Sequence, residues 1–204
     1  MKKYLIYLFT AFIGMSFLSQ AVYAGDAAKG ASLVAVCSAC HGQDGNSPAG
    51  SFPNIAGQNE QYLLKQLMDV QSGDREIVTM TGLLDNYSQT DLENIAAFYA
   101  SKERAYGAAD PELVELGENI YMAGIERKNV AACVACHSPT GQGNGPAKFP
   151  ALAGQWPEYT IAQLKAFQAG ERHNDGESRM MRTTAMDMNE KEMQAVAAYI
   201  SGLR

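Results

Sequence analysis

Two copies of Cys-x-x-Cys-His constrain this chain more than any other feature. They run from Cys37 to His41 and from Cys133 to His137, and they contain all four cysteines of the 204 residues. Two thiols at this spacing can each add to one vinyl group of a single porphyrin, while the next imidazole reaches the iron from the same side. The motifs therefore predict two covalently bound haem c groups. The predicted attachment and ligand residues are Cys37, Cys40 and His41, and Cys133, Cys136 and His137.

Other uses of paired cysteines fit this sequence less well. A thioredoxin-like redox disulfide needs strands that alternate with helices, and no segment has a convincing strand pattern. Structural zinc sites usually separate their two cysteine pairs by roughly 15–20 residues, whereas Cys40 and Cys133 lie far apart in the chain. A simple disulfide within each pair would leave the two adjacent histidines without a role. Haem attachment accounts for both.

The first 24 residues have the pattern of a cleaved secretory signal. Two lysines precede an uncharged, mostly apolar run over residues 4–18, and small residues end the segment at Ala24. We expect residues 1–24 to be removed and the mature chain to begin near Gly25. An uncleaved anchor is the alternative, although the apolar run is shorter than the about 20 residues that a spanning helix needs. Export predicts a periplasmic protein, because c-type cytochromes are assembled outside the cytoplasm.

The charge balance excludes one class of partner. Without the two lysines of the signal, 14 basic residues stand against 22 acidic ones, which gives a net charge of −8. No basic stripe is left to bind nucleic acid. The negative charge is interpreted as a contribution to solubility. The alternative interpretation is that it steers the protein towards a positively charged face of a redox partner.

The two halves of the chain repeat one another. The segment Phe-Pro-Asn-Ile-Ala-Gly-Gln at 52–58 recurs as Phe-Pro-Ala-Leu-Ala-Gly-Gln at 149–155, a shift of 97 positions. The register continues at Tyr62 and Tyr159, Gln66 and Gln163, and Gly73 and Gly170. Beyond an insertion of four residues the shift becomes 101. The repeat predicts two tandem domains over residues 25–101 and 111–204, joined by a polar connector at 102–110.

The repeated segments are helical in pattern. Each half ends with apolar residues spaced i, i+3, i+4, i+7, which lie on one face of a helix. These positions are Leu92, Ile95, Ala96 and Tyr99, and Met193, Val196, Ala197 and Ile200. Each of these helices begins with a capping box, Ser88 with Asp91 and Asn189 with Glu192. The sequence therefore predicts an all-α fold in which each domain wraps around its haem.

Earlier helices follow the same logic in both halves. We expect a first helix over residues 26–36 and its counterpart opening at Asp110-Pro111. The expected middle helices carry Leu63, Leu64, Leu67 and Met68 in one half and Ile161, Leu164 and Phe167 in the other. Met68, on the apolar face of its helix, is interpreted as a core residue.

The second axial ligand decides between an electron carrier and a catalyst. The only histidine outside the motifs is His173, interpreted as an exposed loop residue, so a bis-histidine pair cannot serve both halves. Met80 lies in a loop-like stretch before the capped helix, and the shift of 101 carries it onto Met181. We predict Met80 and Met181 as ligands, with Met180 as the competitor in the second half. Histidine and methionine together leave no open position on the iron.

The whole mature chain resembles the cytochrome c4 family, which is built from two class I cytochrome c folds. The residues that carry the resemblance are both haem motifs, the two Phe-Pro segments, Tyr62–Leu67, Met80–Asp85, and Asn174-Asp175-Gly176 before Met181-Arg182. The resemblance implies axial ligation by Met80 and Met181. It also implies electron transfer from a membrane quinol-oxidising complex towards a terminal oxidase, often with loose membrane association.

The resemblance further suggests a hydrogen bond from each ligand histidine to a proline carbonyl, at Pro53 and Pro150. The alternative is that each proline only shapes its loop.

For function, a dihaem electron carrier without substrate chemistry is the main hypothesis. The alternatives are a cytochrome subunit of a larger dehydrogenase and, less favoured, a dihaem peroxidase, which would need an open or displaceable iron position.

Overall fold

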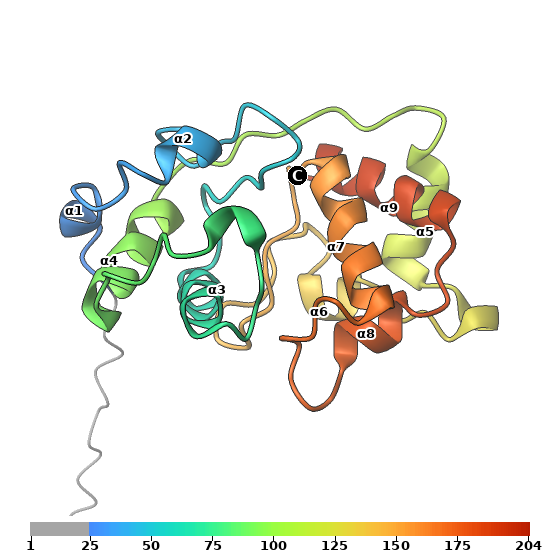
Figure 1. Cartoon of the computed structure of the whole chain (residues 1–204). Coiled ribbons are helices and arrows are strands. Elements are labelled where there is room, and N and C mark those ends of the chain that lie inside the picture. The colour runs from blue at the N-terminus through green and yellow to red at the C-terminus, as the bar shows by residue number, and fades with distance from the viewer. Residues whose placement is uncertain (1–24) are drawn as a thin grey trace, which may run out of the picture.

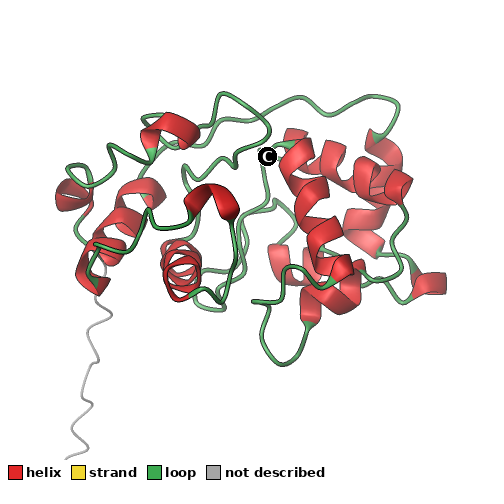
Figure 2. Cartoon of the chain, in the orientation of Figure 1, coloured by secondary structure: helices red, strands yellow, loops and turns green. Residues whose placement is uncertain are grey.

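The computed structural model describes residues 25–204, so the expected signal peptide at 1–24 lies outside the described residues. The first half contains α1 (Ala27–Gly30), α2 (Ser38–His41), α3 (Glu60–Ser72), the 3-10 turn η1 (Val78–Met80) and α4 (Gln89–Ala100). The second half contains α5 (Val114–Ala123), η2 (Glu126–Lys128), α6 (Val134–His137), α7 (Pro157–Ala169), α8 (Met180–Ala185) and α9 (Glu190–Gly202). Between residues 25 and 204 there is no strand, only two isolated bridges (Figure 2). The predicted all-α fold is confirmed.

The two halves lie side by side and have the same internal plan (Figure 1). In the first half α4 packs against α1 and α3, and in the second half α9 packs against α5 and α7. Residues 103–110 run between the halves without a helix. Helices α3 and α7 occupy the centre of the molecule, next to the junction of the halves.

Both terminal helices begin as predicted. The Ser88 hydroxyl accepts a hydrogen bond from the Asp91 amide at 3.2 Å, and the Asp91 carboxylate accepts one from the Ser88 amide at 2.9 Å. At α9 the same reciprocal pair joins Asn189 and Glu192, at 2.9 and 2.8 Å. Each box satisfies amide groups that the first helical turn leaves without partners.

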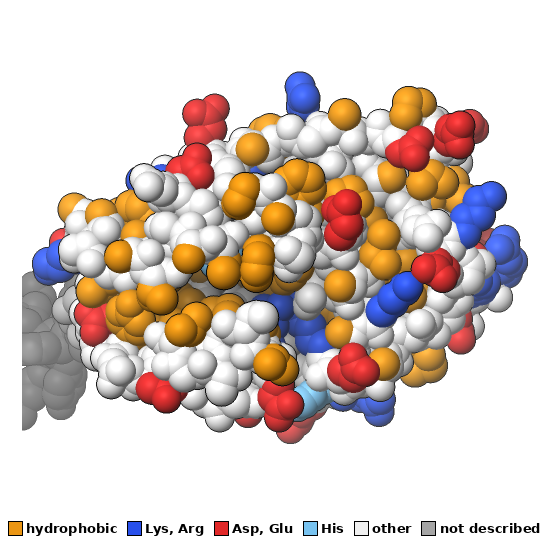
Figure 3. Space-filling view, turned by 45° about the horizontal axis from the view of Figure 1, so that its top comes forward, with side chains coloured by type: hydrophobic (Ala, Val, Ile, Leu, Met, Phe, Trp, Pro, Cys, Tyr) orange, Lys and Arg blue, Asp and Glu red, His pale blue; other side chains and the backbone are white. Residues whose placement is uncertain are grey.

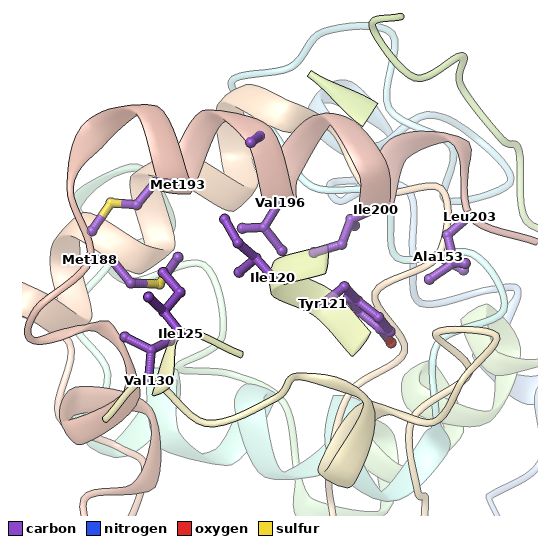
Figure 4. Packing of buried hydrophobic residues seen from close by; sticks show 11 residues of the cluster. Ile120, Tyr121, Ile125, Val130, Ala153, Met188, Met193, Val196, Ile200 and Leu203 are labelled. Atoms are coloured by element: carbon purple, nitrogen blue, oxygen red, sulfur yellow. The ribbon is translucent and has the colours of Figure 1, made fainter. Parts of the chain in front are cut away.

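The buried faces of α4 and α9 form two separate cores. The predicted apolar positions are nearly inaccessible, from 0% exposure at Leu92 to 3% at Ile200. In the second half, Val196 of α9 points towards Ile120 of α5, and Tyr121 lies below Ile200 (Figure 4). The helical periodicity of the sequence therefore identified the core-facing side of both terminal helices.

A glycine lets the first and last helices of each half cross closely. A Cβ atom at Gly30 would stand 2.1 Å from the Asn94 carbonyl oxygen, and one at Gly117 would stand 2.1 Å from that of Ala195. No side chain fits at such a distance, so backbone lies directly against backbone. The same contact in both halves shows that the duplication repeats at the level of helix packing.

Three local expectations were wrong or too broad. The helix expected over 26–36 is limited to α1, and turns lead from it to α2. It ends early because Gly30 disfavours a helix and because the Ser32 hydroxyl donates to the Lys29 carbonyl at 2.8 Å. In the second half, Asp110 accepts backbone bonds in a turn, and α5 begins only at Val114. Met68 is 42% exposed rather than in the core, because it lies off the face of α3 that Leu63 buries.

Substituting Gly117 with alanine tests the close crossing of α5 and α9. We expect Gly117→Ala to lower the free energy of unfolding by about 1–3 kcal/mol, since the new methyl group must push the helices apart. Thermal unfolding of the haem-loaded protein measures the change. Gly145→Ala is the control, because Gly145 has no positive φ and an added Cβ would meet only side-chain atoms of Gln61 and Asn59, which can move aside. Equal stability of Gly117→Ala and wild type would contradict the packing argument.

Glu192 makes the stability of the second half pH-dependent. Its side chain is 7% exposed and accepts hydrogen bonds from Lys128 Nζ and the Asn189 amide, both at 2.8 Å. Burial raises the pKa of Glu192, but the bonds from Lys128 and Asn189 lower it more, so the folded pKa lies below 4.5. A lowered folded pKa stabilises the protein above the unfolded value, and this contribution is lost as pH falls through the folded pKa.

We therefore expect Glu192→Gln to cost about 1.5–3 kcal/mol near pH 7, as for hydrogen bonds to a charged group. The difference from wild type should shrink as pH drops below 4.5. Denaturant unfolding at several pH values measures it. Glu190→Gln is the matched control, because Glu190 and its partner Lys165 are 65% and 50% exposed and such pairs contribute little. A difference that stays constant from pH 7 to pH 3 would refute the assignment.

Candidate haem-binding site

A mostly apolar cavity of about 770 Å³ lies along the junction of the two halves. Figure 3 shows hydrophobic side chains gathered on both sides of a hollow in one face of the molecule. All eight residues predicted from the sequence line this cavity: Cys37, Cys40, His41 and Met80, and Cys133, Cys136, His137 and Met181. The fold thus brings the two motifs, 96 positions apart in the sequence, to one continuous site.

Each Cys-x-x-Cys-His motif forms a single helical turn. Cys37 is the residue before α2 and Cys133 the residue before α6, so the two thiols and the imidazole of each motif lie at positions i, i+3 and i+4 on one face. No disulfide joins any of the four cysteines. Burial raises the pKa of Cys37, and it raises the pKa of Cys133 to about 11.

The histidines of the two motifs are held by matching backbone contacts. His41 Nδ1 lies 3.0 Å from the carbonyl oxygen of Pro53, and His137 Nδ1 lies 2.9 Å from that of Pro150. A carbonyl only accepts, so Nδ1 carries the proton and Nε2 keeps its lone pair free to bind a metal. Burial lowers the pKa of both histidines more than the carbonyls raise it, so both rings are neutral near pH 7. The expected hydrogen bonds to the prolines are confirmed.

Met80, Met180 and Met181 line the cavity, and so does Met188 of the core of the second half. Met80 ends η1 and packs against the core of the first half. Met180 and Met181 both lie in the first turn of α8, where Met180 is 44% exposed and Met181 is half-buried. Of the two competitors in the second half, Met181 is the one withdrawn from solvent.

The junction also holds two arginines that the motif analysis did not identify. Arg75 is 8% exposed and donates to Gln66 at 2.7 Å and, across the junction, to Tyr159 at 3.0 Å. Arg172 makes the corresponding contacts, with Gln163 at 2.7 Å and with Tyr62 and Gln66 of the other half at 3.1 Å. Both arginines line the cavity.

These arginines place positive charge at the cavity wall. Neither one forms an ion pair with another of the described residues. A buried guanidinium needs an anionic partner to offset the loss of hydration. Burial raises the pKa of Tyr62 while Arg172 and Arg75 lower it, and the net shift is downward. The wall is therefore suited to carboxylates on a bound group.

The sequence did carry a signal for this cluster. Arg75 and Arg172 are related by the same shift of 97 as the tyrosines and glutamines beside them, and Arg75 is one of few basic residues in its half. Trp156 and Tyr159 belong to the same set of contacts between the halves. Trp156 Nε1 donates to the Ser47 carbonyl at 3.2 Å, so both residues bond across the junction.

Other possible sites are less developed. His173 is exposed, as predicted, at a small pocket that it shares with Lys65, Asp69 and Asp74. Within residues 25–204, no group of three or more His, Cys, Asp or Glu side chains is arranged to hold a metal ion. A structural zinc site of the kind weighed from the sequence thus has no ligand cluster here.

The comparisons with known proteins agree with this geometry. A family model described as cytochrome c matches residues 27–102 and again residues 114–204. The chain is 45% identical to the cytochrome c4 of Azotobacter vinelandii, and the alignment covers all of both chains. The chain belongs to the cytochrome c4 family. Cytochromes c carry covalent haem, and members of this family are electron carriers rather than enzymes.

Solved structures show the same two-domain architecture. The crystal structure of reduced recombinant cytochrome c4 from Pseudomonas stutzeri matches with a TM-score of 0.87 and 46% identity, covering 89% of this chain and all of the other. A more distant relative is the thiosulfate dehydrogenase electron acceptor of Thiomonas intermedia, 36% identical over 82% of this chain and 78% of its own. No helix within residues 25–204 is long and apolar enough to span a membrane.

Proposed function

We propose that this chain carries two haem c groups and shuttles electrons in the periplasm from a quinol-oxidising complex towards a terminal oxidase. The observation that supports this best is the convergence of two Cys, Cys, His, Met sets on one cavity. A haem iron supplies the one-electron redox chemistry once it is bound. Everything else in the activity depends on how the chain holds and surrounds that iron.

The residues at the cavity fit this group. Cys37 and Cys40 would form thioethers to one haem, and Cys133 and Cys136 to the other. His41 and His137 each hold a proton at Nδ1 and leave Nε2 free, as an iron ligand requires. The arginines at the wall match the carboxylates that a porphyrin carries. The apolar lining limits the access of water to the iron and favours a raised reduction potential.

Met80 and Met181 are the residues that we propose as sixth ligands. Gln71 Nε2 donates to the carbonyls of Leu84 and Tyr87 after the first loop, and Gln168 Nε2 donates in the same way after the second. The corresponding acceptors in the second half are Ala185, Met186 and Met188. These bonds support the shift of 101 that pairs Met80 with Met181, and the exposure of Met180 also favours Met181.

Ligation by histidine and methionine leaves no vacant position on the iron. Methionine also stabilises the reduced state, so such a haem exchanges electrons and does not activate a substrate. The acidic mature chain suits periplasmic solubility, with peripheral membrane association as a further expectation. We keep the proposed domains at residues 25–101 and 111–204, since residues 103–110 between them contain no helix.

One alternative has support from a relative. The similarity to a thiosulfate dehydrogenase electron acceptor favours, as a second candidate, a cytochrome that serves a larger dehydrogenase. Native purification separates the two: a free carrier should elute as a single chain of about 20 kDa, below the 22.0 kDa of the uncleaved chain. A stable complex with a second, substrate-oxidising chain would favour the subunit. A dihaem peroxidase is less supported, because it needs an open iron position and each half has a methionine on the cavity as a proposed sixth ligand.

Replacing the proposed methionines tests the ligand assignment. Met80→Ala should open one haem to carbon monoxide and lower its midpoint potential, while the other haem stays low-spin. Met181→Ala should do the same to the other haem. Optical spectra of the oxidised and reduced protein, with haem content per chain and a carbon monoxide challenge, measure these effects.

Met180→Ala is the matched control, since Met180 precedes Met181 on the same helical turn. It should leave both haems closed to carbon monoxide. Carbon monoxide binding by the Met180 variant, and not by the Met181 variant, would reverse the assignment in the second half. A wild-type protein with a high-spin haem that binds carbon monoxide would overturn the carrier function itself.

A further inference from the structure

Two glutamines bridge the junction in a reciprocal way. Gln58 and Gln155 end the repeated Phe-Pro segment, and they are 7% and 8% exposed. Gln155 Oε1 accepts from the Asn54 amide and its Nε2 donates to the Asn54 carbonyl, both at 2.9 Å. Gln58 holds Ala151 of the other half in the same two-bond manner, at 2.7 and 2.8 Å. Each side chain thus grips the backbone of one residue in the opposite half.

The orientation of both side-chain amides is fixed by a further contact. Gln155 Oε1 also accepts from the Trp156 amide at 3.0 Å, and Gln58 Oε1 accepts from the Asn59 amide at 2.9 Å. Each oxygen therefore meets two N–H donors and each nitrogen meets a carbonyl. Reversing either amide would place donor against donor.

The gripped residues directly follow the prolines that hold the histidines. The carbonyl of Pro53 and the amide of Asn54 belong to one peptide group, whose oxygen accepts from His41 Nδ1 and whose N–H donates to Gln155. A hydrogen-bond chain therefore runs from His41 through this peptide into the second half. The mirror chain runs from His137 through the peptide of Pro150 and Ala151 to Gln58.

The hydrogen bonds in such a series strengthen one another. When the N–H of a peptide donates a hydrogen bond, its carbonyl oxygen becomes more negative and accepts more strongly, especially away from water. A stronger acceptor at Nδ1–H makes the imidazole a more basic ligand, which favours the oxidised iron. The acceptor strength felt by each histidine thus depends on a glutamine of the other half.

We propose that Gln58 and Gln155 are positioning residues that act crosswise: Gln155 tunes the haem bound through His41, and Gln58 tunes the haem bound through His137. This inference rests on the proposed function, because it requires a haem iron at each histidine. It assigns a role to the last residue of the repeated segment. It also gives the two redox centres a route of influence that does not pass through either methionine.

The test is the midpoint potential of each haem in Gln155→Leu and Gln58→Leu. Gln155→Leu should raise the potential of the first haem and leave the second unchanged, although residue 155 belongs to the second half. Gln58→Leu should give the opposite pattern. The Nδ1–H proton resonance of His41 or His137 in the reduced protein should shift in the same crossed manner. Gln155→Met, similar in length to glutamine, replaces Gln155→Leu if that variant fails to assemble.

Asn59→Ala is the control for disturbance of the junction alone. Asn59 Nδ2 donates across it to the carbonyls of Gln142 and Phe149, at 3.1 and 3.0 Å, but bonds neither peptide that holds a histidine. It should leave both potentials unchanged. The Met80→Ala spectrum identifies which potential belongs to the first haem.

The outcomes separate this inference from the proposed function. A wild-type protein without two low-spin haems would refute the function before any glutamine is changed. With two such haems present, equal shifts of both potentials, a shift of the haem in the glutamine's own half, or no shift would overturn the crosswise role.

Discussion

The close crossing of the first and last helices, with backbone lying against a glycine, organises each half of the chain. It places α1 on α4 and α5 on α9, and the terminal helices also pack against one side of the middle helices α3 and α7. Helices α3 and α7 are then available to face the junction, where they contribute to the cavity wall. Because the same crossing recurs at Gly30 and Gly117, the two halves present matching surfaces to one another, and their contacts come in reciprocal pairs.

Much of this structure was predictable from local patterns. The capping boxes and the buried stripes of the terminal helices depend on residues within a few positions of one another, and both appear as expected. Two errors have local causes, namely Gly30 and Ser32 at the end of α1 and the turn at Asp110 before α5. Met68 continues an apolar run in the sequence, yet it lies off the buried face of its helix.

The arginine and glutamine contacts could not be predicted from either half alone. Arg75 meets Tyr159 only because two domains dock, and no local rule specifies which faces meet. The repeat nevertheless contained a clue, since a polar side chain kept at the same position in both copies has a use in both. The loops before α4 and α9, in contrast, differ between the halves. The second loop is four residues longer and contains α8 where the first contains η1. Gln71 and Gln168 nevertheless bond the carbonyls after the two loops in the same way.

The reciprocal grip of Gln58 and Gln155 bears on how a duplicated chain can change over time. Each copy completes the backbone hydrogen bonding of a loop that belongs to the other copy. A substitution of Gln58 or Gln155 therefore changes the hydrogen bonding of a peptide in the other half. The two copies can differ elsewhere, as η1 and α8 do, but at these two loops a change in one copy alters the hydrogen bonding of the other.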